Sequence, residues 1–222
     1  MSFKLLRQPG IVLHVLQIKE ADLLVTLLSK DLGKICGVAK HARRSKKRFS
    51  GGLDLFDCGI FELLSPKGLS DLYHISSFNG KMSWESVRTN LTKFYLASFC
   101  LELTNIFTAQ DDADNGQLFL PLYYSLRKLQ LSENRDEHLC TCIFFNLSLL
   151  DICGYYPCGD HFELEKPLKD WWGQMKQLNK PTIPTDTKLF NASLSVLVNY
   201  NEQIVGKKLQ TGPLIWSAIP KS

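Results

Sequence analysis

The stretch IVLHVLQIK at residues 11–19 decides the fold prediction for the first third of the chain. Its apolar and polar residues alternate and β-branched residues are frequent, which is typical of a β-strand. Outward from it, four more short apolar runs bounded by turn residues predict strands at residues 23–29, 34–39, 54–64 and 69–78. Five short strands within about 80 residues favour a small barrel, and the OB-fold, which binds oligonucleotides, is the natural candidate.

After Asn79-Gly80 the apolar spacing changes to three and four residues, which indicates helices. We expect helices over residues 85–103, 116–131, 136–152 and 187–205, with Ser83 as an N-cap and Gly206 as a C-cap. The sequence therefore predicts an α+β protein with two domains. Residues 1–80 form a five-stranded OB-fold barrel that binds DNA, and residues 81–222 form an α-helical domain with an irregular segment at about 154–184.

The composition excludes several protein classes. The 222 residues are 45% hydrophobic and 22% charged, a balance that argues against a disordered or fibrous chain. The most apolar stretch, residues 142–153, contains Asn146, Ser148 and Asp151 and falls short of the roughly 18 apolar residues that span a membrane. The seven cysteines lie mostly in apolar runs, as free core thiols do in reducing compartments. We expect a cytoplasmic protein without a secretory signal and without membrane contact.

Positive charge is concentrated in residues 1–80, which hold 12 Lys and Arg against 7 Asp and Glu. Within them, the sequence KHARRSKKR at residues 40–48 places six cations in nine residues without an acid. Such a run is most often a solvated loop, but cations this dense repel one another and a bound polyanion relieves the repulsion. The run therefore favours nucleic-acid binding. The alternatives are a protein-interaction adaptor whose basic loop docks an acidic partner, and an RNA-binding OB-fold protein.

Several of these motifs resemble the bacterial RecO family. The similarity is carried by GIVL at residues 10–13, EADLLVTLL at 20–28, LGKI at 32–35 and GVAKHARR at 37–44. His41 stands where that family usually has Gly. Weaker similarities follow in LRKL at 126–129, LLDICGY at 149–155 and GKKL at 206–209.

The resemblance implies a DNA repair and recombination mediator of the RecF pathway, without enzymatic activity. Members bind single- and double-stranded DNA, anneal complementary strands and recognise the C-terminal tail of single-stranded-DNA-binding protein (SSB). With RecR they help to load RecA onto SSB-coated strands. DNA and the SSB tail are therefore the expected direct ligands, RecR is an expected partner, and RecA is engaged indirectly.

The candidate DNA-binding residues are the cations of the run and their neighbours. Six phosphate contacts on a single strand would give a slope of log K against log salt of about −4. Aromatic side chains could stack on bases, and Phe49 is a better candidate than Phe56, Phe61 or Tyr73 because it adjoins the run. The predicted DNA-binding set is Lys34, Lys40, Arg43, Arg44, Lys46, Lys47, Arg48 and Phe49.

A receptor for the acidic, apolar-ended SSB tail needs cations beside an apolar groove. The candidate residues for that groove are Leu126, Arg127, Lys128, Leu129 and Arg135. Helix-face cations more often simply face water, which is the alternative.

No cofactor is expected. Many family members carry a four-cysteine zinc site after the LLDICGY-like helix end, but here only Cys158 and His161 remain of one, and zinc needs four ligands. The acidic loop at residues 111–116 places Ala113 and Leu122 where a calcium loop needs ligands. No nucleotide-binding glycine loop or nucleophile motif occurs, so we expect no catalysis.

Overall fold

The computed structural model describes residues 4–49, 53–66, 72–82, 84–158 and 164–218, in two compact units. The first unit comprises Met1–Trp84 and Thr108–Leu120, and the second comprises Glu85–Phe107 and Pro121–Ser222. The predicted cap Ser83 and the Gly51-Gly52 connection lie outside the described residues.

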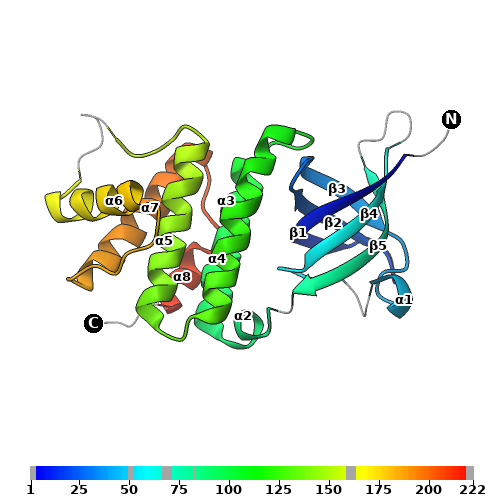
Figure 1. Ribbon diagram of the computed structural model, residues 1–222, viewed down its shortest axis with the longest axis horizontal. Helices are drawn as coiled ribbons and strands as arrows, with labels where there is room; N and C mark the ends of the chain where they lie inside the picture. Colours follow the sequence, from blue (N-terminus) through cyan, green and yellow to red (C-terminus); the bar gives the residue numbers. More distant parts are fainter. Residues whose placement is uncertain (1–3, 50–52, 67–71, 83, 159–163, 219–222) are drawn as a thin grey trace. The chain divides into compact units, whose positions relative to one another are not determined.

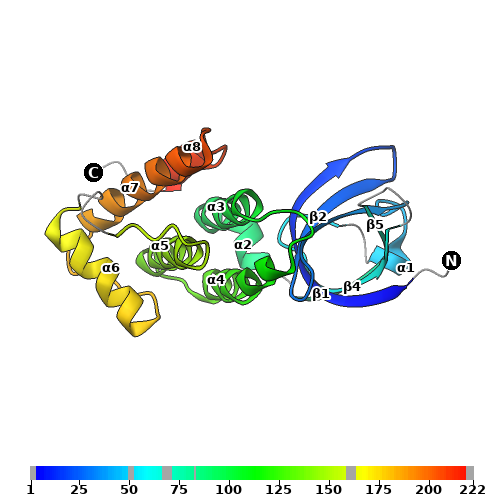
Figure 2. The same ribbon diagram turned by 90° about the horizontal axis from the view of Figure 1, so that it is seen from above.

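Five strands form the first unit, and they close into a barrel in the order β1-β2-β3-β5-β4 (Figures 1 and 2). They are β1 (Leu5–Gln17), β2 (Leu23–Ser29), β3 (Gly33–Ala39), β4 (Cys58–Leu64) and β5 (Tyr73–Met82). Burial alternates along β2 and β3, so that Val25, Leu27 and Ile35 fill the interior. The predicted five-stranded OB-fold barrel, followed by helices, is confirmed.

β1 is longer than the sequence pattern indicated, because it begins at Leu5 rather than Ile11. Its first half pairs with β4 and its second half with β2, with an irregularity between Val12 and His14 where the partner changes. Such a bend lets one strand serve two edges of the barrel and so close it. β5 likewise continues to Met82, so Asn79 and Gly80 lie within a strand and do not interrupt it.

A one-turn helix, α1 (Lys46–Phe49), follows β3 and was not predicted. Its Phe49 side chain is only 1% exposed and belongs to the barrel's apolar core, together with Ala42 and Leu53. The chain between β3 and β4 therefore contributes apolar side chains to the core of the barrel. The same segment carries the cations of the basic run.

Residues 110–115 were expected to form a solvated loop between helices, and residues 116–120 to begin a helix. Instead, residues 108–120 belong to the barrel unit and pack on the turn between β2 and β3. The Asp111 N–H donates to the Lys34 carbonyl at 2.8 Å, and Gln110 forms an isolated bridge with Lys34. The 3-10 helix η1 (Ala113–Leu118) follows, with Leu118 fully buried. The acidic residues of this segment thus belong to an ordered part of the barrel unit.

The second unit is helical throughout. Its elements are α2 (Glu85–Thr89), α3 (Leu91–Phe107), α4 (Phe119–Leu131, from Pro121 on), α5 (Arg135–Ile152), α6 (Lys166–Leu178), α7 (Lys188–Val205) and α8 (Gly212–Ala218). α5 is buried along most of its length, as its all-round apolar sequence predicted. The C-cap predicted at Gly206 is confirmed by its left-handed backbone, with φ of 68°.

The expectation that residues 154–184 are irregular is wrong, because α6 lies within them. Pro167 occupies the first turn of α6, where its missing N–H needs no partner, and Gly173 lies on the exposed side. Trp171 and Trp172 are core residues, 5% and 1% exposed, whose indole N–H groups donate to Thr182 and Ser193. α8 follows in the tail, where the sequence analysis placed no helix.

Candidate nucleic-acid interface

Residues 40–48, called the basic turn below, are ordered by the β1–β2 loop at residues 18–22. The first contact joins the His41 N–H to the Asp22 carboxylate at 2.8 Å. His41 has a φ of 56°, a left-handed conformation that favours glycine. The hydrogen bond from His41 lowers the pKa of Asp22 below its ordinary value. Asp22 thus fixes the point at which the chain leaves β3.

Glu20 and Ala21 make the second set of contacts with the basic turn. The Arg43 N–H donates to the Ala21 carbonyl at 3.3 Å, and Arg43 Nη1 donates to the Glu20 carbonyl at 3.2 Å. Arg44 Nη2 forms an ion pair with Glu20 Oε2 at 2.8 Å. The basic run contains no acid in sequence, but the fold brings Glu20 and Asp22 beside it.

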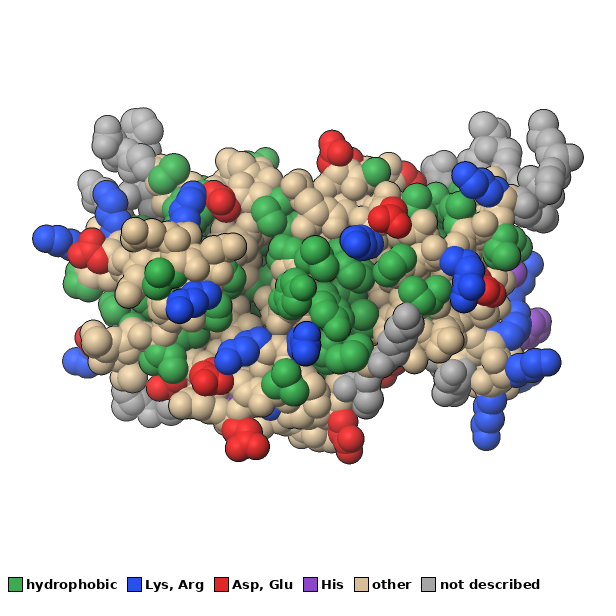
Figure 3. Space-filling view, in the orientation of Figure 1, with side chains coloured by type: hydrophobic (Ala, Val, Ile, Leu, Met, Phe, Trp, Pro, Cys, Tyr) green, Lys and Arg blue, Asp and Glu red, His purple; other side chains and the backbone are tan. Residues whose placement is uncertain are grey.

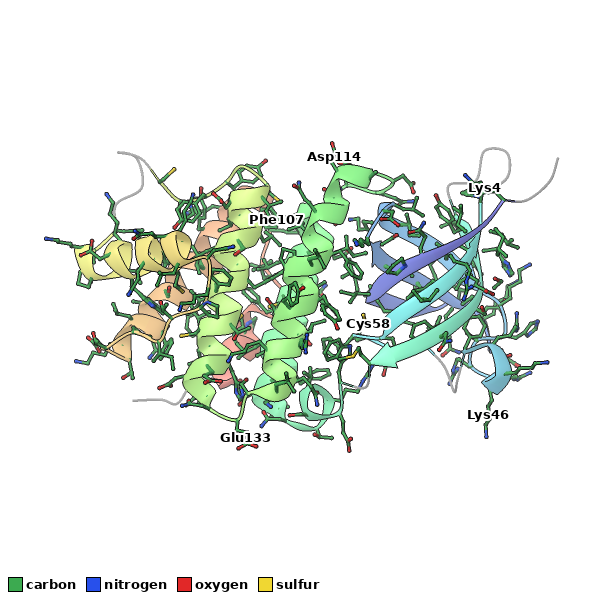
Figure 4. The ribbon with its side chains drawn as sticks, in the orientation of Figure 1. Lys4, Lys46, Cys58, Phe107, Asp114 and Glu133 are labelled. Atoms are coloured by element: carbon green, nitrogen blue, oxygen red, sulfur yellow. The ribbon has the colours of Figure 1, made fainter. Side chains whose placement is uncertain are left out.

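Arg48 is held within the basic turn itself. Its Nη2 donates to the Lys40 carbonyl at 2.8 Å and its Nε to Ser45 Oγ at 3.2 Å, while its guanidinium lies 5.2 Å from the Phe49 ring centre. The three lysines differ: Lys40, Lys46 and Lys47 are exposed and pair with no acid in the described part of the chain. Figure 4 shows Lys46 extending away from α1, and blue side chains gather at this end of the barrel unit in Figure 3.

Six of the predicted cations therefore lie together, whereas Lys34 lies apart. Lys34 is at the opposite end of β3 from Lys40, about 20 Å away at the usual rise per strand residue. It is half-buried, and this burial lowers the pKa of its ammonium group. Its backbone holds the 108–120 segment, so Lys34 is not part of the basic turn.

The prediction that Phe49 stacks on bases is wrong, because its ring is in the barrel core. Phe56 and Phe61 are also fully buried, and Tyr73 packs partly against the same core. An aromatic ring that fills the interior of a small barrel cannot also offer a face to a ligand. Proximity to the cations in sequence did not reveal on which side of the chain the Phe49 ring lies.

A row of side chains on the outer face of the barrel was missed by the sequence reasoning. Strand pairing aligns Leu16 with Leu24, Leu24 with Val38, and Val38 with His74. Leu16 is 50% exposed, and the other three are half-buried. The sequence signal that could have identified this row is the set of alternate residues in each predicted strand that face away from the core. The row includes His74, whose pKa is lowered by burial and by the charges of Lys40 and Arg48.

The predicted partner groove on α4 is partly corrected. Leu126 and Leu129 are fully buried, so they are core residues and line no groove. Arg127 is exposed, Lys128 pairs with Glu137 at 3.3 Å, and Arg135 is half-buried. The exposed apolar side chains of α4 are instead Leu120, Tyr124 and Leu131, which are 45%, 57% and 68% exposed, and apolar side chains lie over α4 in Figure 3.

Cysteine and histidine positions bear on metal binding. Burial raises the pKa of Cys58 and Cys140 to about 12, as expected of core thiols. Cys158 is exposed, and His161 lies outside the described residues. Across the described ranges, no three His, Cys, Asp or Glu side chains cluster as metal ligands would. Nor does any described helix have the length and apolar character needed to cross a bilayer.

Two family models match this chain, one over the barrel strands and one over part of the helices. Residues 1–80 match the family model for the recombination protein O N terminal, and residues 88–161 match the model for its C terminal. The chain is 30% identical to the DNA repair protein RecO of Desulfosudis oleivorans over 149 residues, which are 67% of this chain. It is 32% identical to the DNA repair protein RecO of Geobacter metallireducens over 155 residues, which are 70% of this chain.

The matched stretch spans 56% of the Desulfosudis protein and 61% of the Geobacter protein. The two family models together match residues 1–80 and 88–161, which include the basic turn and α4. Both candidate surfaces thus lie within the residues that the family models match.

Proposed function

The chain belongs to the RecO family, and on that premise we propose that it acts in DNA repair by binding single-stranded DNA on the basic turn of its barrel. One observation carries the proposal: Lys40, Arg43, Arg44, Lys46, Lys47 and Arg48 lie together on one edge of an OB-fold barrel. A rigid array of cations attracts a phosphate backbone whatever its sequence.

The outer row from Leu16 to His74 supports a preference for single strands. It borders the basic turn. Val38 lies two residues before Lys40 in the chain and pairs with His74, and the charge of Lys40 lowers the pKa of His74. Unpaired bases expose apolar faces that such a row can contact, whereas the bases of a duplex are stacked inside it. Double-stranded DNA would then bind through its phosphates alone.

Strand annealing follows from the same charges. Two complementary strands repel each other, and a surface that screens both phosphate backbones lowers the cost of bringing them together. This role is non-enzymatic. We extend the proposal to the RecF pathway, in which the protein with RecR would help to load RecA onto SSB-coated strands.

We propose α4 as the binding site for the SSB tail, with Arg127 and Lys128 as its cations and Tyr124 and Leu131 as its apolar contacts. The support is the exposure of all four side chains on one helix of the second unit. A short acidic peptide with an apolar end needs both kinds of contact. Arg135 begins the next helix and is half-buried.

The test is binding of a fluorescent single-stranded oligonucleotide across a salt series. The sharpest variant changes Lys40, Lys46 and Lys47 to Gln, because these three lysines are exposed and their loss removes charge without breaking hydrogen bonds of the turn. We expect the slope of log K against log salt to shrink by about 2 units in the variant.

The matched control changes the exposed Lys166, Lys180 and Lys188 of the helical unit to Gln, an equal loss of charge. We expect this control to keep the wild-type slope. Equal slopes for both variants, or no salt-dependent binding by wild type, would contradict the proposal and favour an adaptor for an acidic partner. Stronger competition by RNA than by DNA of the same length would favour an RNA-binding protein.

A further inference from the structure

Glu20 is the acidic side chain that pairs with the basic turn. Its carboxylate lies 2.8 Å from Arg44 Nη2, while Arg43 and Arg48 donate to carbonyl and hydroxyl oxygens. Within the described chain the three lysines of the turn form no ion pair, although the charge of Lys40 acts on the nearby Asp22 carboxylate and helps to lower its pKa. One cation of the six is therefore already matched with an anion before any ligand arrives.

The Glu20–Arg44 pair is exposed, with side-chain exposures of 85% and 69%. Exposed pairs are weak and are screened by salt, so a second anion can displace the carboxylate from Arg44. A phosphate can do so with two parallel hydrogen bonds, because guanidinium geometry suits phosphate as well as carboxylate.

Glu20 differs in this respect from its neighbour Asp22. Asp22 accepts a backbone N–H from His41 and thus fixes the path of the chain. The turn is also fixed by the Ala21 and Glu20 carbonyls, which any residue at position 20 supplies. The Glu20 carboxylate is therefore dispensable for the shape of the turn, and its contact with Arg44 is the contact that a ligand can replace.

We propose that Glu20 competes with DNA for Arg44. In the free protein its carboxylate occupies the position beside the Arg44 guanidinium that a phosphate of the bound strand takes. This inference rests on the proposed function. Each strand that binds breaks the Glu20–Arg44 pair and leaves a carboxylate beside the phosphates. Glu20 thereby weakens the binding of DNA and speeds its release, which suits a protein that must release strands once they have annealed.

The first measurement is the affinity of the full chain for a single-stranded oligonucleotide, with Glu20→Gln against wild type. We expect the variant to bind about two- to fivefold tighter at low salt, with the gain shrinking as salt rises. The dissociation rate should fall by a similar factor. Urea unfolding of both proteins checks that the turn remains folded.

A double-mutant cycle separates displacement at Arg44 from a general change of charge. In an Arg44→Gln background, Glu20→Gln should give at most a small gain, because the contested cation is gone. The control is Glu62→Gln, an equal change of charge outside the basic turn: Glu62 lies 3.6 Å from Arg7 where β1 pairs with β4, and it also accepts a hydrogen bond from the Ser77 hydroxyl at 2.6 Å. We expect it to leave the affinity within about a factor of 1.5 of wild type.

The outcomes are distinct. Weaker binding by Glu20→Gln would mean that Glu20 positions the turn, and a gain that persists without Arg44 or appears equally in Glu62→Gln would mean an unspecific charge effect; each overturns the inference and leaves the proposed function standing. If wild type shows no salt-dependent binding, both fail together.

Discussion

The basic turn and α4 present cations in two different ways. In the basic turn, six cations in nine residues all lie on one edge of the barrel, because the apolar residues between and after them, Ala42 and Phe49, enter the core. On α4, Arg127 and Lys128 stand between Leu126 and Leu129, and the helical twist sends the leucines into the core and the cations outward.

This difference in how the cations are arranged determines which class of ligand each surface can bind. The basic turn offers dense charge with only Glu20 and Asp22 beside it among the described residues, which suits a long polyanion. α4 offers Arg127, which pairs with no acid in the described part of the chain, Lys128, which pairs with Glu137, and exposed apolar side chains. This combination suits a short peptide with an acidic and an apolar part. In the turn the six cations share one surface, whereas on the helix Arg127 and Lys128 face outward and the leucines on either side of them face the core.

Phe49→Ala should have the largest effect, because it removes the apolar anchor beneath the cations. Emptying a buried Phe site costs about 3–5 kcal/mol of unfolding free energy. Urea unfolding followed by circular dichroism measures that loss. The neighbouring exposed Lys47→Ala should change stability by less than about 0.5 kcal/mol. Equal stability of the two variants would show that the Phe49 ring does not belong to the core.

Arg127→Ala should have an intermediate effect, confined to peptide binding at the α4 surface. Binding of a short peptide with an acidic, apolar end should weaken by about 1 kcal/mol, roughly fivefold, since an exposed charge contact is lost. Fluorescence anisotropy with a labelled peptide measures it, and oligonucleotide binding is the parallel assay. Lys166→Ala on α6 serves as the control of equal charge. A loss of oligonucleotide affinity as large as the loss for the peptide would remove the distinction between the two surfaces.

Asp22→Asn should have the smallest effect, visible as a change in pH dependence. The hydrogen bond from His41 lowers the folded-state pKa of Asp22 below its ordinary value of 3.8. The carboxylate therefore stabilises the fold above that ordinary value, and the stabilisation is lost as pH falls through the lowered pKa. Wild type should lose more stability between pH 6 and pH 3 than the variant, as judged by urea midpoints. An identical pH dependence of the two midpoints would contradict a role for the ionised carboxylate.

The barrel was largely predictable because its signals are local. Alternation along β2 and β3 and the turn residues between them give strand positions, and five strands of that length favour one closed architecture. The ends were less certain. β1 begins at Leu5, six residues before the alternating stretch that predicted it, because β4 supplies pairing partners for Leu5 to Gly10. The local sequence of β1 gives no indication of that pairing.

The helical unit shows the opposite error. Proline and glycine in residues 154–184 indicated irregular chain, yet Leu168, Trp171, Trp172 and Met175 recur at helical spacing and are buried. Their periodicity was the correct signal. Pro167 did not oppose it because a proline in the first turn removes no hydrogen bond of the helix.

The sequence by itself determined the class of the fold, the two-part order of barrel and helices, and the site of dense positive charge, since each depends on periodicity or on composition within a short stretch. Only the tertiary structure decided that Phe49 is a core residue, that Lys34 stands apart from the other cations, and that Glu20 pairs with Arg44. These last features depend on which distant segments meet and on which side of the chain a residue faces. Neither is encoded by a residue's neighbours along the chain.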